Sequence, residues 1–270
     1  MIKKLYSFNN NREIWRIIPA GEENLLIEER NKKTKEVYFN CLNINSGKKI
    51  LNGFQLSEKF WVGVEAVHND IIFFHKFLKP DLPTHKSIIA FDIKKKSVLW
   101  ENTDLSFYSI SDNSVIAYKA LFEGREYYKL NLNTGELLKE LKDIQIETIS
   151  TGSNKNELEE FTFSSIYTDE IELKEAVKKY IKKAKEEKVV VGKVEFIVQK
   201  SILFISFHSP TKSGKLNKIF NAVDIVTGKI ILNKIINYNI EVFIPDSFFL
   251  IKNLLFVIFE EKKLECYKIQ

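Results

Sequence analysis

The sequence predicts an all-β protein that repeats one four-stranded unit five times and carries one helical insert. Three observations predict this class: a β-rich composition, a recurring strand–turn–strand phrase and a single segment with helical periodicity. The chain of 270 residues contains 21 Phe and 10 Tyr, and aromatic residues suit a pleated, half-buried surface. Only 5 Pro and 10 Gly are present, which excludes collagen-like and low-complexity chains.

The recurring phrase consists of an alternating apolar strand, an Asp or Asn, a polar turn and a second apolar strand. Its copies are "YFNCLNINSGKKIL" (38–51), "IIAFDIKKKSVLW" (88–100), "YYKLNLNTGELLK" (127–139) and "FNAVDIVTGKIIL" (220–232), with a truncated copy, "LECYKIQ", at the end. A tight hairpin turn needs a residue with positive φ, which Gly47, Gly135 and Gly228 supply. The Asp or Asn can accept hydrogen bonds from the backbone of the turn. The second copy has Lys and Ser where the others have Gly, so we expect a different type of turn there.

The spacing of the phrase matches the blades of a β-propeller. The steps are 49 residues from Asn43 to Asp92 and 39 from Asp92 to Asn131, close to the period of a four-stranded blade. The step to Asp224 is 93 residues, or one blade plus an insertion. The last unit lacks one strand, and residues 2–8 offer a spare strand that would remove the exposed edge. We therefore expect a single domain, 1–270, folded as a five-bladed propeller that the N-terminal strand closes.

The phrase also resembles the repeat of the quinoprotein-like β-propellers, the superfamily with the PQQ-like repeat. Blades of that superfamily carry an apolar strand, Asp, Thr-Gly-Lys and a strand that ends in Trp. "AVDIVTGKIIL" matches all but the Trp, and "AFDIKKKSVLW" keeps the Asp and the Trp. The layout is similar to that of small uncharacterised bacterial propeller proteins. The larger ring, adjacent cysteine pair and calcium-binding carboxylates of the dehydrogenases have no counterpart here, so the resemblance implies the fold and no cofactor.

Residues 146–190 interrupt the repeat between the third and fourth blades. Within them, "TDEIELKEAVKKYIKKAKEEK" (168–188) has an apolar stripe at helical spacing, and Lys174, Lys178 and Lys182 lie on the other side of the helix. One interpretation is a helix that packs on the propeller with solvated lysines. The other is a basic surface for an acidic protein, a nucleic acid or membrane headgroups.

The insert marks one face of the expected ring as the candidate binding face. It emerges on the same face as the loops between the second and third strands of the blades, 29–36, 76–86, 122–126 and 208–218, and binding groups tend to lie on such loops. His75, His85, His208 and Arg125 map to this face. A metal site made by the three histidines would need blades two and four to converge, and no ligand-spacing motif supports one. No metal ion is therefore predicted.

Carboxylates in the expected innermost strands suggest the alternative of an enzyme. Glu65, Glu195 and Glu241 can face the central channel, where two carboxylates would serve a glycan-active hydrolase. They can equally line a wet channel, which leaves room for a small molecule, and pair with cations such as Arg16. Trp15, Trp61 and Trp100 fall within expected strands, where packing between blades explains them better than ligand stacking. No phosphate-binding loop or nucleophile motif is present, so the sequence favours a protein that is not an enzyme.

The remaining features concern partners and location. The formal charge of +5 is interspersed rather than gathered in one patch, which argues against a nucleic-acid partner. Cys41 and Cys266 are the only cysteines and suit a reducing compartment. With no signal peptide or membrane span in the sequence, we expect a cytoplasmic, non-catalytic binding or scaffold protein that recognises a partner protein through the face with the insert and the long loops.

Overall fold

The structure is a computed structural model of the 270-residue chain, and it describes residues 2–79, 82–141, 161–172, 175–187 and 190–270. The chain separates into two compact units. Unit 1 comprises residues 1–11 and 160–270, and unit 2 comprises residues 12–159. The expected single domain, 1–270, stays a prediction.

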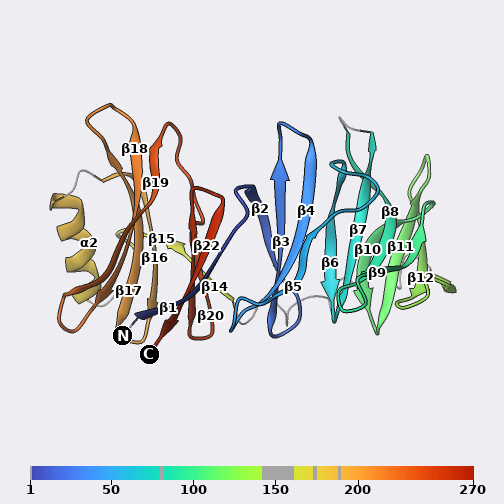
Figure 1. Ribbon diagram of the computed structural model, residues 1–270, viewed down its shortest axis with the longest axis horizontal. Helices are drawn as coiled ribbons and strands as arrows, with labels where there is room; N and C mark the ends of the chain where they lie inside the picture. Colours follow the sequence, from blue (N-terminus) through green and yellow to red (C-terminus); the bar gives the residue numbers. More distant parts are fainter. Residues whose placement is uncertain (1, 80–81, 142–160, 173–174, 188–189) are drawn as a thin grey trace. The chain divides into compact units, whose positions relative to one another are not determined.

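Unit 2 contains three four-stranded sheets, each with its strands in chain order and antiparallel (Figure 1). Sheet I consists of β2 (Glu13–Pro19), β3 (Asn24–Asn31), β4 (Glu36–Asn43) and β5 (Lys49–Phe54). Sheet II consists of β6 (Val62–His68), β7 (Ile71–Lys79), β8 (Leu82–Asp92) and β9 (Ser97–Asn102). Sheet III consists of β10 (Ser106–Ser111), β11 (Ser114–Ala120), β12 (Arg125–Asn131) and β13 (Leu137–Leu141).

The described residues of unit 1 form two five-stranded sheets and one helix. Sheet IV has the order β15 (Ser165–Ile166), β16 (Val191–Gln199), β17 (Ile202–Pro210), β18 (Leu216–Asp224), β19 (Ile230–Ile240). Sheet V has the order β1 (Ile2–Asn9), β22 (Lys263–Ile269), β21 (Leu254–Phe259), β20 (Phe248–Ile251), β14 (Phe161–Phe163). Among the described residues the chain is thus all-β with five antiparallel sheets, in agreement with the predicted class and repeat.

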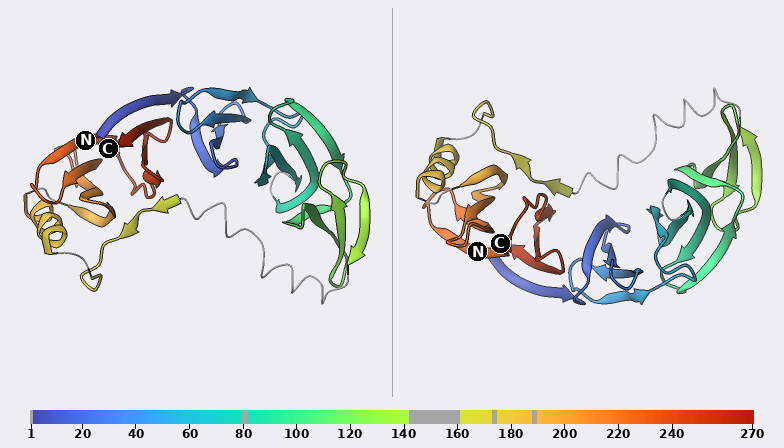
Figure 2. Two further views of the ribbon diagram at one scale, coloured as in Figure 1. Left: turned by 90° about the horizontal axis from the view of Figure 1, so that it is seen from below. Right: turned by 90° about the horizontal axis from the view of Figure 1, so that it is seen from above.

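The predicted pairing of the two ends of the chain is confirmed. β1 pairs antiparallel with β22, from Ile2 opposite Ile269 to Asn9 opposite Lys263, and the two ends of the chain lie side by side in both views of Figure 2. The N-terminal strand thereby covers the edge that β22 would otherwise expose.

The repeated turn has the same hydrogen bonds in all four copies. The residue in the glycine position donates its N–H to the main-chain carbonyl of the Asp or Asn, as Gly135 does to Asn131 at 2.9 Å. The side chain of the same Asp or Asn accepts from the backbone N–H three residues later in the turn. Gly47, Gly135 and Gly228 have φ between 69° and 72°. The expected different turn in the second copy is wrong, because Lys96 adopts φ 57° and donates to Asp92 O at 2.8 Å as the glycines do. The Asp92 carboxylate, which accepts from Lys94 N and Lys95 N, stabilises this strained conformation.

The cores lie where sheets face one another or the helix. In unit 2, one cluster joins sheets I and II around Phe39, Phe74 and Phe91, and another joins sheets II and III around Phe73 and Trp100. In unit 1, sheets IV and V share a core that includes Phe204, Phe220, Phe248 and Leu255. These side chains supply most of the stabilisation, since burial of a large apolar side chain contributes about 1.5–3 kcal/mol.

The insert differs from the prediction in its details. Its helix α2 is described over Glu175–Glu187 and lies beside sheet IV (Figure 2). Its Val177, Ile181 and Ala184 are buried in one cluster with residues of that sheet, as the apolar stripe indicates. Residues 161–166 form two short strands that the repeat did not predict: β14 pairs with β20 and β15 with β16. No helix in the described ranges is long and apolar enough to cross a bilayer.

Gly135 offers a test of the packing between sheets II and III. A Cβ at this position would lie 2.6 Å from the Trp100 ring, whereas a Cβ at Gly53, whose φ is also positive, would meet nothing within 4 Å. Gly135→Ala should lower the free energy of unfolding by about 2–4 kcal/mol, because the alanine must adopt the left-handed conformation and its Cβ overlaps the Trp100 ring. Gly53→Ala should cost only about 1–2 kcal/mol. Urea unfolding followed by tryptophan fluorescence is the measurement, because all three Trp lie in unit 2; equal losses would contradict the packing.

Candidate functional site

Sheet II brings one carboxylate and two imidazoles together at the end where β7 leads into β8. Glu65 comes from β6, His75 from β7 and His85 from β8, and their ligand atoms all lie within 4.8 Å of one another. We call this group the Glu–His–His cluster. The Glu65 Oε1 atom lies 2.8 Å from His85 Nδ1, with which it shares a hydrogen bond, and 3.1 Å from His75 Nδ1.

A β-bulge aims Glu65 at the two histidines. Val64 pairs with Phe74 and Ala66 with Phe73, so Glu65 is an extra residue without a partner on β7. Such a bulge changes the direction of a side chain. Sheet III has a bulge at the corresponding place, with Tyr108 in the position of Glu65. The cluster is therefore a feature of sheet II rather than of the repeat.

The two imidazoles are parallel and stacked, with ring centroids 3.5 Å apart and an angle of 8° between the planes. The ring of Phe77 is edge-on to both, at 5.0 and 5.4 Å. His75 lies on Gly63, where a Cβ would come within 2.8 Å of its ring. Gly63 therefore permits the close approach of the imidazole to β6.

Burial sets the protonation of the cluster. His75 is 2% exposed, and burial lowers its pKa against the opposing effect of Glu65. Burial alone would raise the pKa of Glu65, but the neighbouring His75 and His85 outweigh it and the pKa is lowered. At neutral pH the cluster thus combines a carboxylate with a neutral buried imidazole.

His75 has no hydrogen-bond partner for either ring nitrogen among the residues that the structure describes. Its Nδ1 is near Glu65 Oε1 but not in a direction that makes a hydrogen bond. A buried polar atom without a partner lowers the stability of the folded chain by about 1–3 kcal/mol. The burial of this imidazole without a hydrogen bond therefore needs a physical reason.

Arginines hold the neighbouring edge of sheet I against the cluster. Arg16 donates to Val64 O at 3.0 Å, and Arg30 donates to Val62 O at 2.8 Å. The buried Glu28 accepts from Arg30 Nε at 2.7 Å. The carboxylate that Arg16 contacts is Glu28, with Arg16 Nε 3.8 Å from Glu28 Oε2, and not one of the three expected channel carboxylates. These contacts hold the backbone of β6 just before Glu65.

A second charged cluster lies in unit 1 and includes His208 and Glu195. Lys218, which is fully buried, donates to Glu195 Oε2 at 2.8 Å and to Ile244 O. Glu195 Oε1 accepts from Asp246 N at 2.9 Å, and His208 Nε2 accepts from Ile244 N at 3.2 Å. Burial lowers the pKa of Lys218 although Glu195 opposes the shift. All three side chains bind the segment that leads from β19 to β20, so this cluster has a structural role.

The remaining predicted residues are placed as follows. Glu241 is exposed in the bend after β19, where it pairs with Lys215 at 3.0 Å, so its expected place in an innermost strand is wrong. His85, expected in a loop, lies in β8, and Arg125 is the first residue of β12.

The lysines of the insert and two tryptophans complete the set. Lys178 pairs with Glu175 at 4.0 Å and Lys182 is exposed, while Lys174 lies outside the described residues. Trp100 packs between sheets as expected, but Trp15 is 51% exposed.

The three predicted carboxylates have different partners. Glu65 contacts two histidines, Glu195 contacts the buried Lys218, and Glu241 contacts the exposed Lys215. None of these contacts joins two of the carboxylates, so the described residues provide no observation that favours the glycan-hydrolase alternative.

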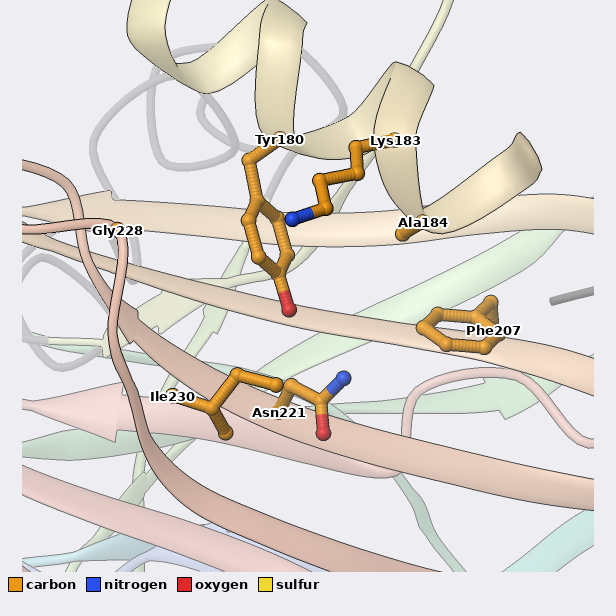
Figure 3. Close-up of a pocket in the computed structure, with 7 residues that line it drawn as sticks. All are labelled: Tyr180, Lys183, Ala184, Phe207, Asn221, Gly228 and Ile230. Atoms are coloured by element: carbon orange, nitrogen blue, oxygen red, sulfur yellow. The ribbon is translucent and has the colours of Figure 1, made fainter. Parts of the chain in front are cut away.

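Figure 3 shows a further hollow, of about 90 Å³, between α2 and sheet IV. The Tyr180 hydroxyl points from the helix toward Asn221 and Ile230, and Phe207 lies beside them. The buried Asn221 Oδ1 has no hydrogen-bond partner among the described residues. The hollow has room for a few water molecules and no charged group from sheet IV in its lining.

Comparisons with known proteins bear on part of the chain. A family model described as "Domain of unknown function (DUF4905)" matches residues 18–100, which is less than half of the chain and includes the Glu–His–His cluster. No curated protein matches the sequence.

Solved structures that match this chain include the following two. A europium-containing methanol dehydrogenase is 12% identical with a TM-score of 0.32, and the match covers 87% of this chain but only 44% of the dehydrogenase. An uncharacterised protein from Listeria monocytogenes EGD-e is 15% identical with a TM-score of 0.33, and the match covers 92% of this chain and 75% of that protein. At such TM-scores neither likeness carries an argument, so the superfamily of the chain stays a prediction.

The buried pair in unit 1 gives one test of the structural role of Glu195. Lys218→Met leaves Glu195 as an uncompensated buried charge, which should lower the free energy of unfolding by about 3–5 kcal/mol. The exposed pair of Lys215 and Glu241 is the control. Lys215→Met should change the free energy of unfolding by less than about 1 kcal/mol. Urea unfolding followed by circular dichroism measures both. A loss for Lys218→Met as small as for Lys215→Met would show that the buried pair does not hold unit 1 together.

His208 should make unit 1 less stable in mild acid. Burial, followed by the charge of Lys218, lowers its pKa from 6.5 to about 4. Between these values the unfolded chain binds a proton that the folded chain does not, so stability is complete above pH 6.5 and falls toward pH 4. Unfolding free energies of the wild type and His208→Gln across this range are the measurement. The wild type should show the steeper fall, and identical slopes would contradict the assignment.

Proposed function

We propose that the chain is a non-catalytic protein-binding module that recognises its partner with one end of unit 2. We call it the hairpin end: the end of sheets I–III at which β3, β7 and β11 lead into β4, β8 and β12, at the top of Figure 1. The observation that carries the proposal is the set of exposed aromatic side chains and stacked cations at this end.

On sheet I the exposed group is built around Trp15. Its indole is 51% exposed, because the bulge between Ile14 and Arg16 leaves Trp15 without a partner on β3. Lys32 Nζ lies 5.1 Å from the ring and the Arg30 guanidinium 5.5 Å from it. Such cation–π contacts stabilise the position of the ring while its face remains available.

On sheet III the exposed group lies in the short connection from β11 to β12. Phe122 is fully exposed and Leu121 is 45% exposed. Next to them the Arg125 guanidinium lies 4.3 Å from the Tyr118 ring. A fully exposed phenylalanine at the tip of a hairpin gains nothing from the fold of the chain, and a partner that buried it would remove its apolar area from water.

The residue types at this end are those that contribute most to protein–protein binding. Trp, Tyr and Arg dominate the side chains whose removal weakens interfaces, and Phe is enriched in interface cores. They project from hairpins of rigid sheets, so little conformational entropy is lost on binding. We favour a protein partner over a nucleic acid, whose binding depends on many cations that neutralise phosphates, because the formal charge of +5 is interspersed along the sequence rather than gathered in one patch.

We further propose that the five sheets are the blades of one propeller of the quinoprotein-like type. The repeated turn, the four-stranded unit and the β1–β22 pairing support this arrangement. In such a ring the insert would belong to the same binding face as the hairpin end.

A photo-crosslinking experiment tests the binding surface. Phe122→benzoylphenylalanine in the native cell should crosslink a partner, whereas Val98→benzoylphenylalanine should not. Val98 is similarly exposed, at 47%, but lies in β9 next to the turn at the opposite end of sheet II. Adding Trp15→Ala and Arg125→Ala should reduce the crosslinked fraction at least tenfold through loss of two anchor side chains. Equal crosslinking from positions 122 and 98 would contradict the proposal.

A further inference from the structure

We infer that Glu65, His75 and His85 form a binding site for a divalent first-row transition metal ion, with Zn²⁺ as the ion that suits it best. The inference is independent of the proposed partner surface, because it depends on the Glu–His–His cluster and on neither Trp15 nor Phe122. Its basis is the convergence of three ligand-type side chains from three adjacent strands.

The buried His75 is the first argument for an ion. Its side chain is 2% exposed and both ring nitrogens lack a hydrogen-bond partner among the described residues. The Nδ1 atom faces the cluster, 3.1 Å from Glu65 Oε1. A bound cation would use the Nδ1 lone pair and so remove the cost of leaving this atom unsatisfied.

The ligand separations are the second argument. Zinc binds His nitrogens and carboxylate oxygens at about 2.0–2.2 Å in a tetrahedron, which places two ligands of one ion about 3.4 Å apart. Glu65 Oε1 lies 2.8 Å from His85 Nδ1 and 3.1 Å from His75 Nδ1. These two separations are shorter than the value for a tetrahedral site by about 0.3–0.6 Å.

One ring must also turn. A metal ion lies in the plane of the imidazole that binds it, and the two rings are now parallel at 3.5 Å, so both lone pairs cannot meet at one point between them. The side chain of His85 is 40% exposed and can rotate, whereas His75 is held on Gly63. Binding thus converts the stacked pair into two ligands, each with its remaining proton on Nε2.

The donor set selects the class of ion. Two imidazole nitrogens and one carboxylate suit Zn²⁺ and its neighbours in the first transition row, while Ca²⁺ and Mg²⁺ prefer six or more oxygen ligands. Metal ions bind a deprotonated carboxylate and neutral imidazoles, so binding releases any protons that these three groups carry. Three protein ligands leave one position of a tetrahedron for water or another small ligand.

Metal titration of the full-length chain, stripped with a chelator, tests the inference. Zn²⁺ should bind with a stoichiometry of one by calorimetry, and Co²⁺ should give the visible spectrum of a tetrahedral site. Mg²⁺ and Ca²⁺ at the same concentration should not compete. X-ray absorption of the zinc-loaded wild type should show two imidazole ligands, a measurement that does not depend on any variant.

Variants locate the ion. His85→Asn and Glu65→Gln should each weaken Zn²⁺ binding at least tenfold, since even loss of an outer-shell partner costs 10–100-fold. His68→Asn is the matched control, because His68 lies at the other end of β6 in the same sheet and should leave the affinity unchanged. Zn²⁺ should raise the melting temperature of the wild type and the control more than that of the two cluster variants.

Two results would overturn the inference. One is the absence of stoichiometric Zn²⁺ binding by the wild type. The other is an equal affinity in the wild type, Glu65→Gln and His85→Asn, which would place the ion elsewhere. Either result leaves crosslinking from position 122 unaffected, so the two proposals fail separately.

Discussion

The hydrogen bonds of the repeated turn are the constraint on which the sheets depend. In each copy the side chain of an Asp or Asn accepts from the backbone of the turn, and the residue in the left-handed conformation donates to the main-chain carbonyl of the same Asp or Asn. This turn fixes the register of the strands on either side of it. A slip by one residue would move every buried side chain of a strand to the opposite face, so the register decides which side chains form the cores.

The turn also shows that glycine is not required at its left-handed position. Glycine is the residue best suited to φ near +70°, and three copies use it. Lys96 adopts the same conformation in the second copy, because two backbone N–H groups bound to the Asp92 carboxylate and the surrounding hairpin offset the cost for a residue with a Cβ. The side-chain acceptor is thus present in every copy, while the glycine is dispensable.

Two clusters show how the environment decides the role of a glutamate. Glu195 accepts from the fully buried Lys218 and from Asp246 N, and together these groups hold the connection from β19 to β20. Glu65 faces two imidazoles, one of them buried without a hydrogen-bond partner among the described residues. The first arrangement is complete by itself. The second has unused bonding capacity at its centre, and for this reason we assign the binding site to it.

The sequence by itself determined the all-β class, the repeat, the turn and the pairing of residues 2–8 with the last strand, because hydrophobic alternation and turn chemistry are local properties of the chain. It also indicated Glu65, His75 and His85 as separate candidates. Only the tertiary structure brought them together, since a bulge has no clear sequence signal and a one-residue insertion in β6 decides where Glu65 points. In the same way the exposure of Trp15 and the complete burial of Lys218 depend on which side chains pack beside them, and spacing along the chain does not contain that information.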